Sequence, residues 1–291
     1  MSILLLSIGF GLITASVIAI AGVGLSLQFG VTNFVNFAYG DFMTLGMYLT
    51  LLFGSVLGLN VFEALPLVVL CTGLAGVITN RLVLDSFTRR GSNPIILLIA
   101  TIGVSLIIQS GLLAVWGSQF QKFALGASQP LHVGPFIFTP RQLVILGIAV
   151  LAMIVIHVLL RYTRLGKAMR AMSDRRTLAR IVGINTGWLT DWTWFISTAM
   201  AGLAGVVLAI NTASFTPFTG FGFLLVIFAA VIVGGIGKPY GAMLGALIIG
   251  VITSVAASYM DSAYKDAIAF AVLIGVLLVR PEGIFASRGR C

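Results

Sequence analysis

The feature that most constrains the fold of this chain is a series of long apolar runs. A bilayer has a hydrocarbon core about 30 Å thick, and a helix needs about 20 apolar residues to cross it. Of the 291 residues, 59% are hydrophobic and only 9% are charged. We therefore expect an all-α, polytopic transmembrane helical bundle of about eight to ten spans. The runs lie near residues 3–27, 37–58, 64–84, 94–116, 141–160, 192–211, 222–236, 240–260 and 265–280.

Two of these runs need comment. The run at 222–236 is short, and the turn-forming segment 234–239 follows it closely, so spans in this part of the chain are candidates for broken or re-entrant helices. The run at 3–27 lacks a preceding basic segment and is longer than the apolar part of a signal peptide, so we expect it to remain as the first span. A separate soluble domain is not indicated, and one transmembrane domain over residues 1–291 is predicted.

The distribution of basic residues predicts the orientation. The chain carries 17 Lys and Arg against eight Asp and Glu, and the segment 161–186 holds seven of the 17. Basic residues between apolar runs are typical of cytoplasmic loops, not of a nucleic-acid-binding protein. With nine spans, the N-terminus and the loop 117–140 face outward and the C-terminus is cytoplasmic. The other basic residues that then fall inside are Arg81, Arg89, Arg90, Arg280, Arg288 and Arg290.

Polar residues interrupt the apolar pattern in the stretch FGVTNFVNFAYGDFMTLGMYL, residues 29–49. If this stretch were helical, Asn33, Asn36 and Gly40 would share one side, as would Asn33, Phe37 and Asp41. One interpretation is a discontinuous helix that lines a solute path, with Asn33, Asn36, Tyr39 and Asp41 beside it. The alternative is a short cytoplasmic turn over residues 28–36, with Asp41 capping or pairing near the membrane surface. An acidic residue at membrane depth is rare and is usually functional or paired.

The basic segment 161–186 has an internal order. Apolar and small residues alternate with arginines over residues 165–184, and Ser173 and Asp174 interrupt the alternation. This pattern predicts two short amphipathic helices with a turn between them. A solvated loop would explain the charge but not the ordered alternation. We therefore expect a docking surface for a cytosolic partner.

Glycines recur at a spacing of four near the C-terminal end of the chain. Gly237, Gly241 and Gly245 follow one another, and Gly202 with Gly205 forms a similar group in the sixth run. Small residues at helical spacing let membrane helices approach closely. Helix packing is the expected role of these glycines.

Residues typical of catalysis are sparse in the sequence. Gly237 and Lys238 are not part of a phosphate-binding loop, because Ile232 and Pro239 occupy the flanking positions. The two histidines and two cysteines are far apart and suggest neither a metal site nor a disulfide framework. We expect no enzyme activity, no cofactor and no metal in this chain, and an energy source outside it.

Three stretches carry a resemblance to a known family. The runs GLSLQFGVTNFVNFAYGDFMTLGMYL (24–49), TRLGKAMRAMSDRRTLARIVGIN (163–185) and VIVGGIGKPYGAMLGALIIG (231–250) resemble segments of branched-chain amino-acid ABC transporter permeases. The family commonly has His and Glu where this chain has Tyr39 and Asp41. It also includes permeases for urea and short amides, so a urea or amide importer is an alternative, as is a standalone channel or secondary carrier.

The resemblance implies a permease subunit in the cytoplasmic membrane of a bacterium or archaeon. Its implied partners are a second, related permease, two ATPase subunits that bind ATP and Mg²⁺, and a periplasmic or lipoprotein solute-binding protein. The segment at about 161–191 would be the coupling loop. The residues expected to couple to the ATPases are Leu165, Gly166, Arg170, Asp174, Arg175, Gly183, Ile184 and Asn185.

Overall fold

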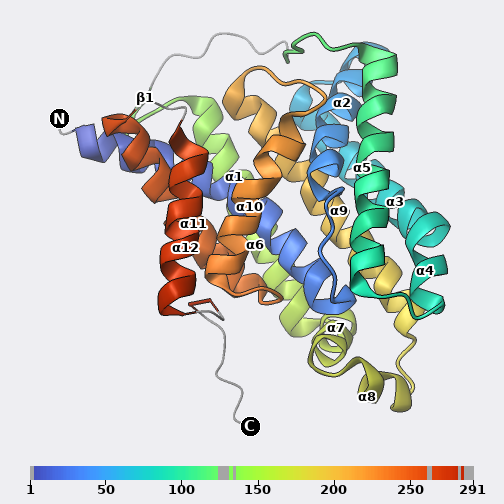
Figure 1. Cartoon of the computed structure of the whole chain (residues 1–291). Coiled ribbons are helices and arrows are strands. Elements are labelled where there is room, and N and C mark those ends of the chain that lie inside the picture. Colours follow the sequence, from blue (N-terminus) through green and yellow to red (C-terminus); the bar gives the residue numbers. More distant parts are fainter. Residues whose placement is uncertain (1–2, 124–130, 134–135, 261–263, 281–282, 285–291) are drawn as a thin grey trace. The chain divides into compact units, whose positions relative to one another are not determined.

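The computed structural model describes residues 3–123, 131–133, 136–260, 264–280 and 283–284, and these ranges are almost entirely helical (Figure 1). The helices that match the predicted apolar runs are α1 (Ile3–Thr32), α2 (Tyr39–Leu57), α3 (Val61–Thr79), α5 (Pro94–Trp116), α6 (Pro140–Tyr162), α9 (Thr186–Thr212), α10 (Thr219–Gly234), α11 (Pro239–Tyr259) and α12 (Lys265–Val279). The remaining elements are the π-helical turn η1 (Asn80–Leu84), α4 (Asp85–Arg89), the strands β1 (Leu131–Val133) and β2 (Phe136–Phe138), and the helices α7 (Arg164–Asp174) and α8 (Arg176–Ile181).

These helices confirm the prediction of a polytopic helical bundle. Seven of the described helices are long and apolar enough to cross a membrane, and α10 is an apolar helix of 16 residues. Two helices differ from the predicted runs. α1 continues to Thr32 instead of ending at residue 27, and α9 begins at Thr186, six residues before the predicted run, because Asn185 caps it there. Residues 285–291 lie outside the described ranges, so the cytoplasmic C-terminus stays a prediction.

The chain forms two compact units, and each is described by itself. The first contains residues 1–26, 124–153 and 225–291. Here α11 packs on α10 through glycine, because an added Cβ at Gly245 would collide with the carbonyl oxygen of Ala230. Gly241 also meets α10, at Gly234. The expectation that Gly237 belongs to the same helical series is wrong: Gly237 lies in the turn before α11 with a φ of 78°, where a left-handed backbone favours glycine.

The second unit contains residues 27–123 and 154–224, and α2, α3 and α9 form its core. Gly202 on α9 packs against Thr72 of α3, and Gly205 packs against the backbone of Met43 on α2. Small residues allow these helix axes to come close, as expected in a membrane protein. The aromatic side chains of Tyr39 on α2 and Trp194 on α9 are fully buried in this unit.

Two turns of matching build occur in the second unit. One follows α1 and precedes α2; the other follows α9 and precedes α10, and the number of residues between the helices is the same. Each turn begins with a residue in the left-handed conformation, Asn33 with a φ of 59° and Ala213 with a φ of 61°. Among the described residues, no other non-glycine residue has a positive φ.

The helices that follow the two turns meet at their second residues. A Cβ added to Gly40 on α2 would lie 2.8 Å from the carbonyl carbon of Gly220 on α10, and one added to Gly220 would lie 3.0 Å from the carbonyl carbon of Gly40. The Gly220 N–H donates a hydrogen bond of 3.0 Å to Thr44 Oγ1. The two turns themselves lie toward opposite ends of α5. Phe34 of the first borders a cavity with Pro94, and Phe215 of the second pairs with Gln121 beyond Trp116.

We predict that Gly205→Ala destabilises the protein by about 1–3 kcal/mol, because the new methyl group would lie 2.7 Å from the Met43 carbonyl carbon and would force α9 away from α2. The apparent unfolding temperature of the purified protein in detergent measures the effect. Gly103→Ala on α5 is the matched control, since an added Cβ there meets nothing within 4 Å. Equal unfolding temperatures for the two variants would contradict the tight packing of α9 on α2.

Candidate functional site

A buried polar cluster surrounds the start of α2 in the second unit. Its members are drawn from α1, the first turn, α2, α5 and α9, and all are at most 8% exposed. They form two groups that do not share a hydrogen bond among those described. The first group is Asp41, Ser105 and Gln109, and the second is Gln28, Asn36 and Ser197.

Asp41 is the fully buried acidic residue of this cluster. Its Oδ1 accepts a hydrogen bond of 2.8 Å from Gln109 Nε2, and the same amide group donates to Ser105 Oγ at 3.1 Å. Asp41 lies in the first turn of α2, where the helix dipole favours negative charge. Its Oδ2 has no hydrogen-bond partner among the described residues. The site can therefore accept one further hydrogen bond from a donor that enters it.

Asn36 stabilises the backbone of the first turn. Its Oδ1 accepts from the Ala38 N–H at 3.0 Å, and its Nδ2 donates to Gln28 Oε1 at 3.2 Å. Ser197 of α9 donates to the same Gln28 oxygen. A chain that leaves a helix inside a membrane must satisfy its freed backbone groups in this way.

The alternative of a turn at residues 28–36 is wrong for residues 28–32, which are part of α1. The pairing that this alternative expected for Asp41 is present, with Gln109 as the partner, and the depth of Asp41 in the membrane stays a prediction. The expected shared helical side is also wrong, because residues 33–38 are not helical. Asn33 is exposed and left-handed, whereas Asn36 and Tyr39 are buried. Whether these residues line a solute path stays a prediction.

A cavity of about 530 Å³ lies beside the first turn. Asn33 and Phe34 form part of its wall, and Met172, Asp174 and Arg176 of the predicted coupling loop form another part. The cavity thus brings the end of α1 next to the junction of α7 and α8.

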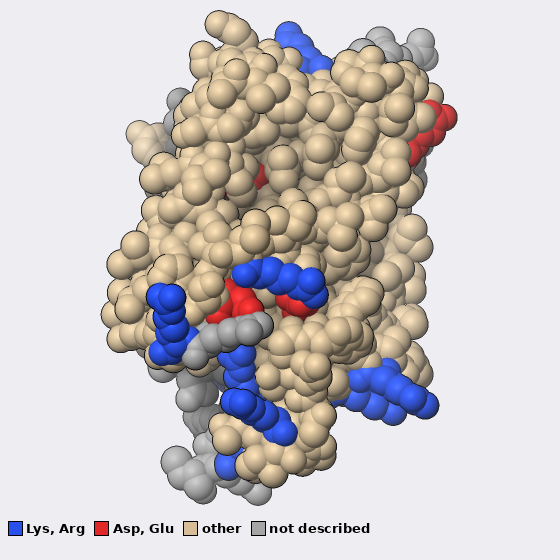
Figure 2. Space-filling view, turned by 90° about the vertical axis from the view of Figure 1, so that its right-hand side faces the viewer, with Lys and Arg blue, Asp and Glu red and all other residues tan. Residues whose placement is uncertain are grey.

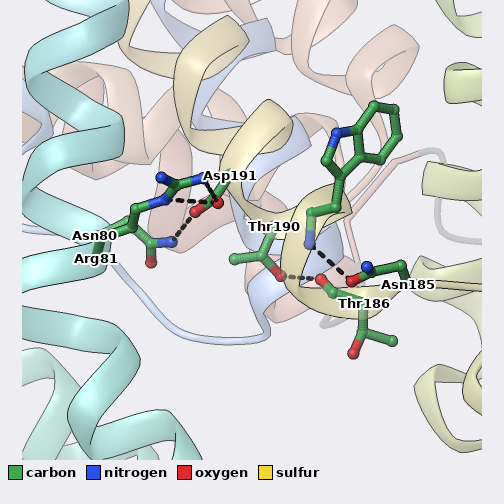
Figure 3. Close-up of polar contacts among 7 residues, drawn as sticks. Asn80, Arg81, Asn185, Thr186, Thr190 and Asp191 are labelled. Atoms are coloured by element: carbon green, nitrogen blue, oxygen red, sulfur yellow. Dashed lines mark hydrogen bonds and ion pairs between the residues drawn. The ribbon is translucent and has the colours of Figure 1, made fainter.

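A second cavity, of about 870 Å³, lies between η1, α8 and the start of α9. Asp191 joins its walls (Figure 3): its Oδ2 lies 2.7 Å from the guanidinium of Arg81, and its Oδ1 accepts from Asn80 Nδ2 at 2.9 Å. Asn185 caps α9 by accepting from the Trp188 N–H at 3.0 Å. The sequence analysis missed Asp191, although an acidic residue at the edge of an apolar run was a usable signal.

Charged groups give the second cavity a basic wall. Arg176 and Arg180 of α8 both line it. Burial lowers the pKa of Arg176, and the nearby charge of Arg180 lowers it further. Figure 2 shows Lys and Arg gathered at one end of the face formed by α3, α4 and α5, with acidic side chains in a hollow among them. The wall formed by the two arginines favours an acidic group from outside.

The coupling loop folds as the two short helices that its alternation predicts, α7 and α8. They separate at Arg175, which has an extended backbone, one residue after Asp174. Gly166, Met169 and Met172 form the buried face of α7, and a Cβ at Gly166 would collide with the backbone of α6 at Leu160. The other expected coupling residues are exposed or half-buried: Leu165, Arg170, Asp174, Arg175, Gly183, Ile184 and Asn185.

Within the described ranges, no group of three or more His, Cys, Asp or Glu side chains lies close enough together to hold a metal ion.

Residues 7–277 match a protein family described as the permease component of the branched-chain amino-acid transport system. The permease LivH of Salmonella typhimurium, named for high-affinity branched-chain amino-acid transport, is 32% identical over 94% of this chain and 92% of its own length. BraD of Pseudomonas aeruginosa, a permease of the same description, is 32% identical over 94% of this chain and 93% of its own length.

A more distant relative is the ribose import permease RbsC of Escherichia coli, which is 27% identical over 89% of this chain and 80% of its own length. No solved structure matches the chain. The family match over residues 7–277 extends through both compact units and includes the buried polar cluster and the coupling loop.

We predict that Gln109→Leu lowers stability by about 1–3 kcal/mol, because it removes the amide group that donates a hydrogen bond to the buried carboxyl group of Asp41. The double variant Asp41→Leu with Gln109→Leu should recover part of the loss, since apolar groups replace both partners. Unfolding temperatures in detergent are measured for the wild type, Asp41→Leu, Gln109→Leu and the double variant. Together they give the interaction free energy between the two side chains. Strict additivity of the two single effects would argue against a stabilising contact between these side chains.

Proposed function

The chain belongs to the family of branched-chain amino-acid transport permease components, and from this premise we propose that it is the membrane-spanning subunit of an ATP-driven importer of branched-chain amino acids. The observation that carries the proposal is the similarity to LivH and BraD, which extends over 94% of the chain. The seven described helices that can cross a membrane agree with a multi-pass transport subunit.

We propose that separate ATPase subunits bind ATP and Mg²⁺ and dock on α7 and α8. Two features of the loop support this docking. Its buried face fixes α7 against α6 at Gly166, while Arg170 and Asp174 remain exposed for a partner. The basic wall of the second cavity, formed by Arg176 and Arg180, offers a place for an acidic side chain of the ATPase.

The cavity beside the first turn gives the coupling a route. Asp174 and Arg176 share its wall with Asn33 and Phe34, so a displacement of the α7–α8 junction acts on the turn that precedes α2. The proposed cycle uses this shared cavity wall. Closure of the ATPases moves the loop, and the loop moves the start of α2. The transport path then changes between outward and inward access.

We further propose that the path runs beside Asn33, Asn36, Tyr39 and Asp41. The free Oδ2 of Asp41 supports this placement, because it can accept a hydrogen bond from the ammonium group of an amino acid. Asn33 would lie where the path leaves the buried cluster, since it is exposed at the cavity wall. Asn36 would keep the first turn in its shape while a solute passes.

The remaining partners follow from the same proposal. They are a second, related permease, two ATPases and an external solute-binding protein, assembled in the cytoplasmic membrane of a bacterium or archaeon. The end of the second unit that carries α7 and α8 would face the cytoplasm, and the end with Gln121 and Phe215 would face outward. The C-terminus would lie in the cytoplasm.

Purification from the native membrane with identification of the bound proteins, followed by uptake in proteoliposomes, tests the proposal. We expect two ATPase subunits, and uptake of labelled leucine that requires ATP and the binding protein. Labelled urea and ribose are the competing solutes. Uptake of urea or ribose in place of leucine would reject the proposed solute, and uptake by the chain alone would reject the importer.

A second prediction concerns the coupling loop. Replacing Arg170 and Asp174 together by alanine should lower ATP-dependent uptake by about tenfold or more while the ATPases still hydrolyse ATP, because the two exposed side chains transmit the movement. The ratio of solute transported to ATP hydrolysed is the measurement. Lys265→Ala with Asp266→Ala, an exposed pair of the same charges at the start of α12, is the control and should leave the ratio unchanged. An unchanged ratio in the Arg170 and Asp174 variant would remove these residues from the coupling.

A further inference from the structure

Four aromatic side chains gather at the end of the second unit that is opposite to α7 and α8. Tyr48 of α2 is the central member, with ring centroids 5.2 Å from Trp116 at the end of α5 and 5.3 Å from Phe215 in the second turn. Phe123 lies 5.1 Å from Phe215 on the other side. We call these four residues the aromatic cluster. Tyr48 and Phe215 are at most 1% exposed, whereas Trp116 and Phe123 are half-buried, so the centre of the cluster is closed.

A backbone contact holds the second turn in place. The Gln121 N–H donates to the Phe215 carbonyl oxygen at 2.9 Å, and the Phe215 N–H donates to the Gln121 carbonyl oxygen at 3.0 Å. This pair of hydrogen bonds is an isolated bridge between the turn and the segment after α5. Two hydrogen bonds and a few ring contacts are a small barrier to separation.

The aromatic cluster and the Asp41 contact follow one another along α2 and α5. Asp41 and Tyr48 are seven residues apart on α2, and Gln109 and Trp116 are seven residues apart on α5, so each pair shares a helix face. The polar contact of Asp41 with Gln109 and the aromatic contact of Tyr48 with Trp116 are therefore successive rungs between the same helices. Seven residues correspond to about 10 Å along a helix axis.

The Tyr48 hydroxyl group gives independent support for a second conformation, in which the aromatic cluster is open. It is buried and has no hydrogen-bond partner among the described residues. A buried hydroxyl group without a partner costs free energy, which a state that exposes it to water or to a polar solute would recover. The closed aromatic cluster is thus poised to open at Tyr48.

From these observations we propose that the aromatic cluster is the external gate of the transport path, closed in this structure by Phe215 and opened when the bridge to Gln121 breaks. The inference rests on the proposed function for the direction of the path. A zwitterionic aliphatic amino acid fits the two rungs. Its ammonium group would meet Asp41, and its apolar side chain would lie against the rings of Tyr48 and Trp116.

The two matching turns link the gate to the coupling loop. The first turn adjoins the coupling loop, the second closes the aromatic cluster, and the helices that follow them touch at Gly40 and Gly220. A shift of α2 at its start would therefore press on α10 at its start, immediately after the second turn. The external gate would open or close in response to the cytoplasmic loop.

Cysteine accessibility tests the gate. The reporter is Ser105→Cys, placed beneath the Asp41 rung in a background with Cys71→Ser and Cys291→Ser, and a membrane-impermeant thiol reagent is added from outside to the permease without ATPases. We expect Phe215→Ala to raise the labelling rate by about 3- to 10-fold, because it removes two ring contacts. Phe218→Ala, in the same turn but 49% exposed, should leave the rate unchanged.

Gln121→Pro is the second variant, since it removes one N–H donor of the bridge and keeps all four rings. It should raise labelling in the same direction. Labelling that stays at the wild-type rate in both variants, with the cysteine reactive after denaturation, would overturn the gate. Because the assay needs neither solute nor ATP, the gate can fail while leucine uptake succeeds, or stand while the proposed solute is rejected.

Discussion

The contact between Gly40 and Gly220 is the constraint on which the rest of the second unit depends. Two helices begin at this point with their backbones in contact, and a single methyl group on either residue would separate them. Each helix can begin there only because a short turn returns the chain from the end of the preceding helix. Each turn requires its first residue, Asn33 or Ala213, to adopt the left-handed conformation. This conformation is unfavourable for an alanine.

The membrane environment explains how the polar groups around this contact are arranged. Backbone groups released by the first turn find partners in Asn36 and in Thr101 of α5, whose hydroxyl group accepts from the Phe37 N–H. In a medium without water each unpaired group is costly, so nearly complete pairing is expected. Among the described residues, five buried side-chain atoms lack a hydrogen-bond partner: Ser26 Oγ, Gln28 Nε2, Asp41 Oδ2, the Tyr48 hydroxyl group and Trp194 Nε1. Two of them, on Asp41 and Tyr48, lie on the same face of α2.

Prediction from the sequence succeeded where the signal was local. Nine apolar runs became nine helices, and the alternation at 165–184 became α7 and α8. It left a discontinuous helix and a turn open at residues 28–36, where the chain is helical to Thr32 and turns at 33–38, and it failed at Gly237, which lies outside α11. Both outcomes have the same cause. Asn and Gly suit a helix face and a turn equally well by spacing, and contacts from distant segments decide between them.

The sequence by itself determined that the chain is a multi-pass membrane protein, where its helices lie and which loop is basic, because hydrophobic length and charge act over neighbouring residues. Only the tertiary structure decided which polar groups pair. Asp41 with Gln109, Asp191 with Asn80, and Tyr48 with Phe215 join segments that are far apart in the chain. Such pairings depend on how helices pack, and packing depends on the shapes of many side chains at once, so no local pattern records them.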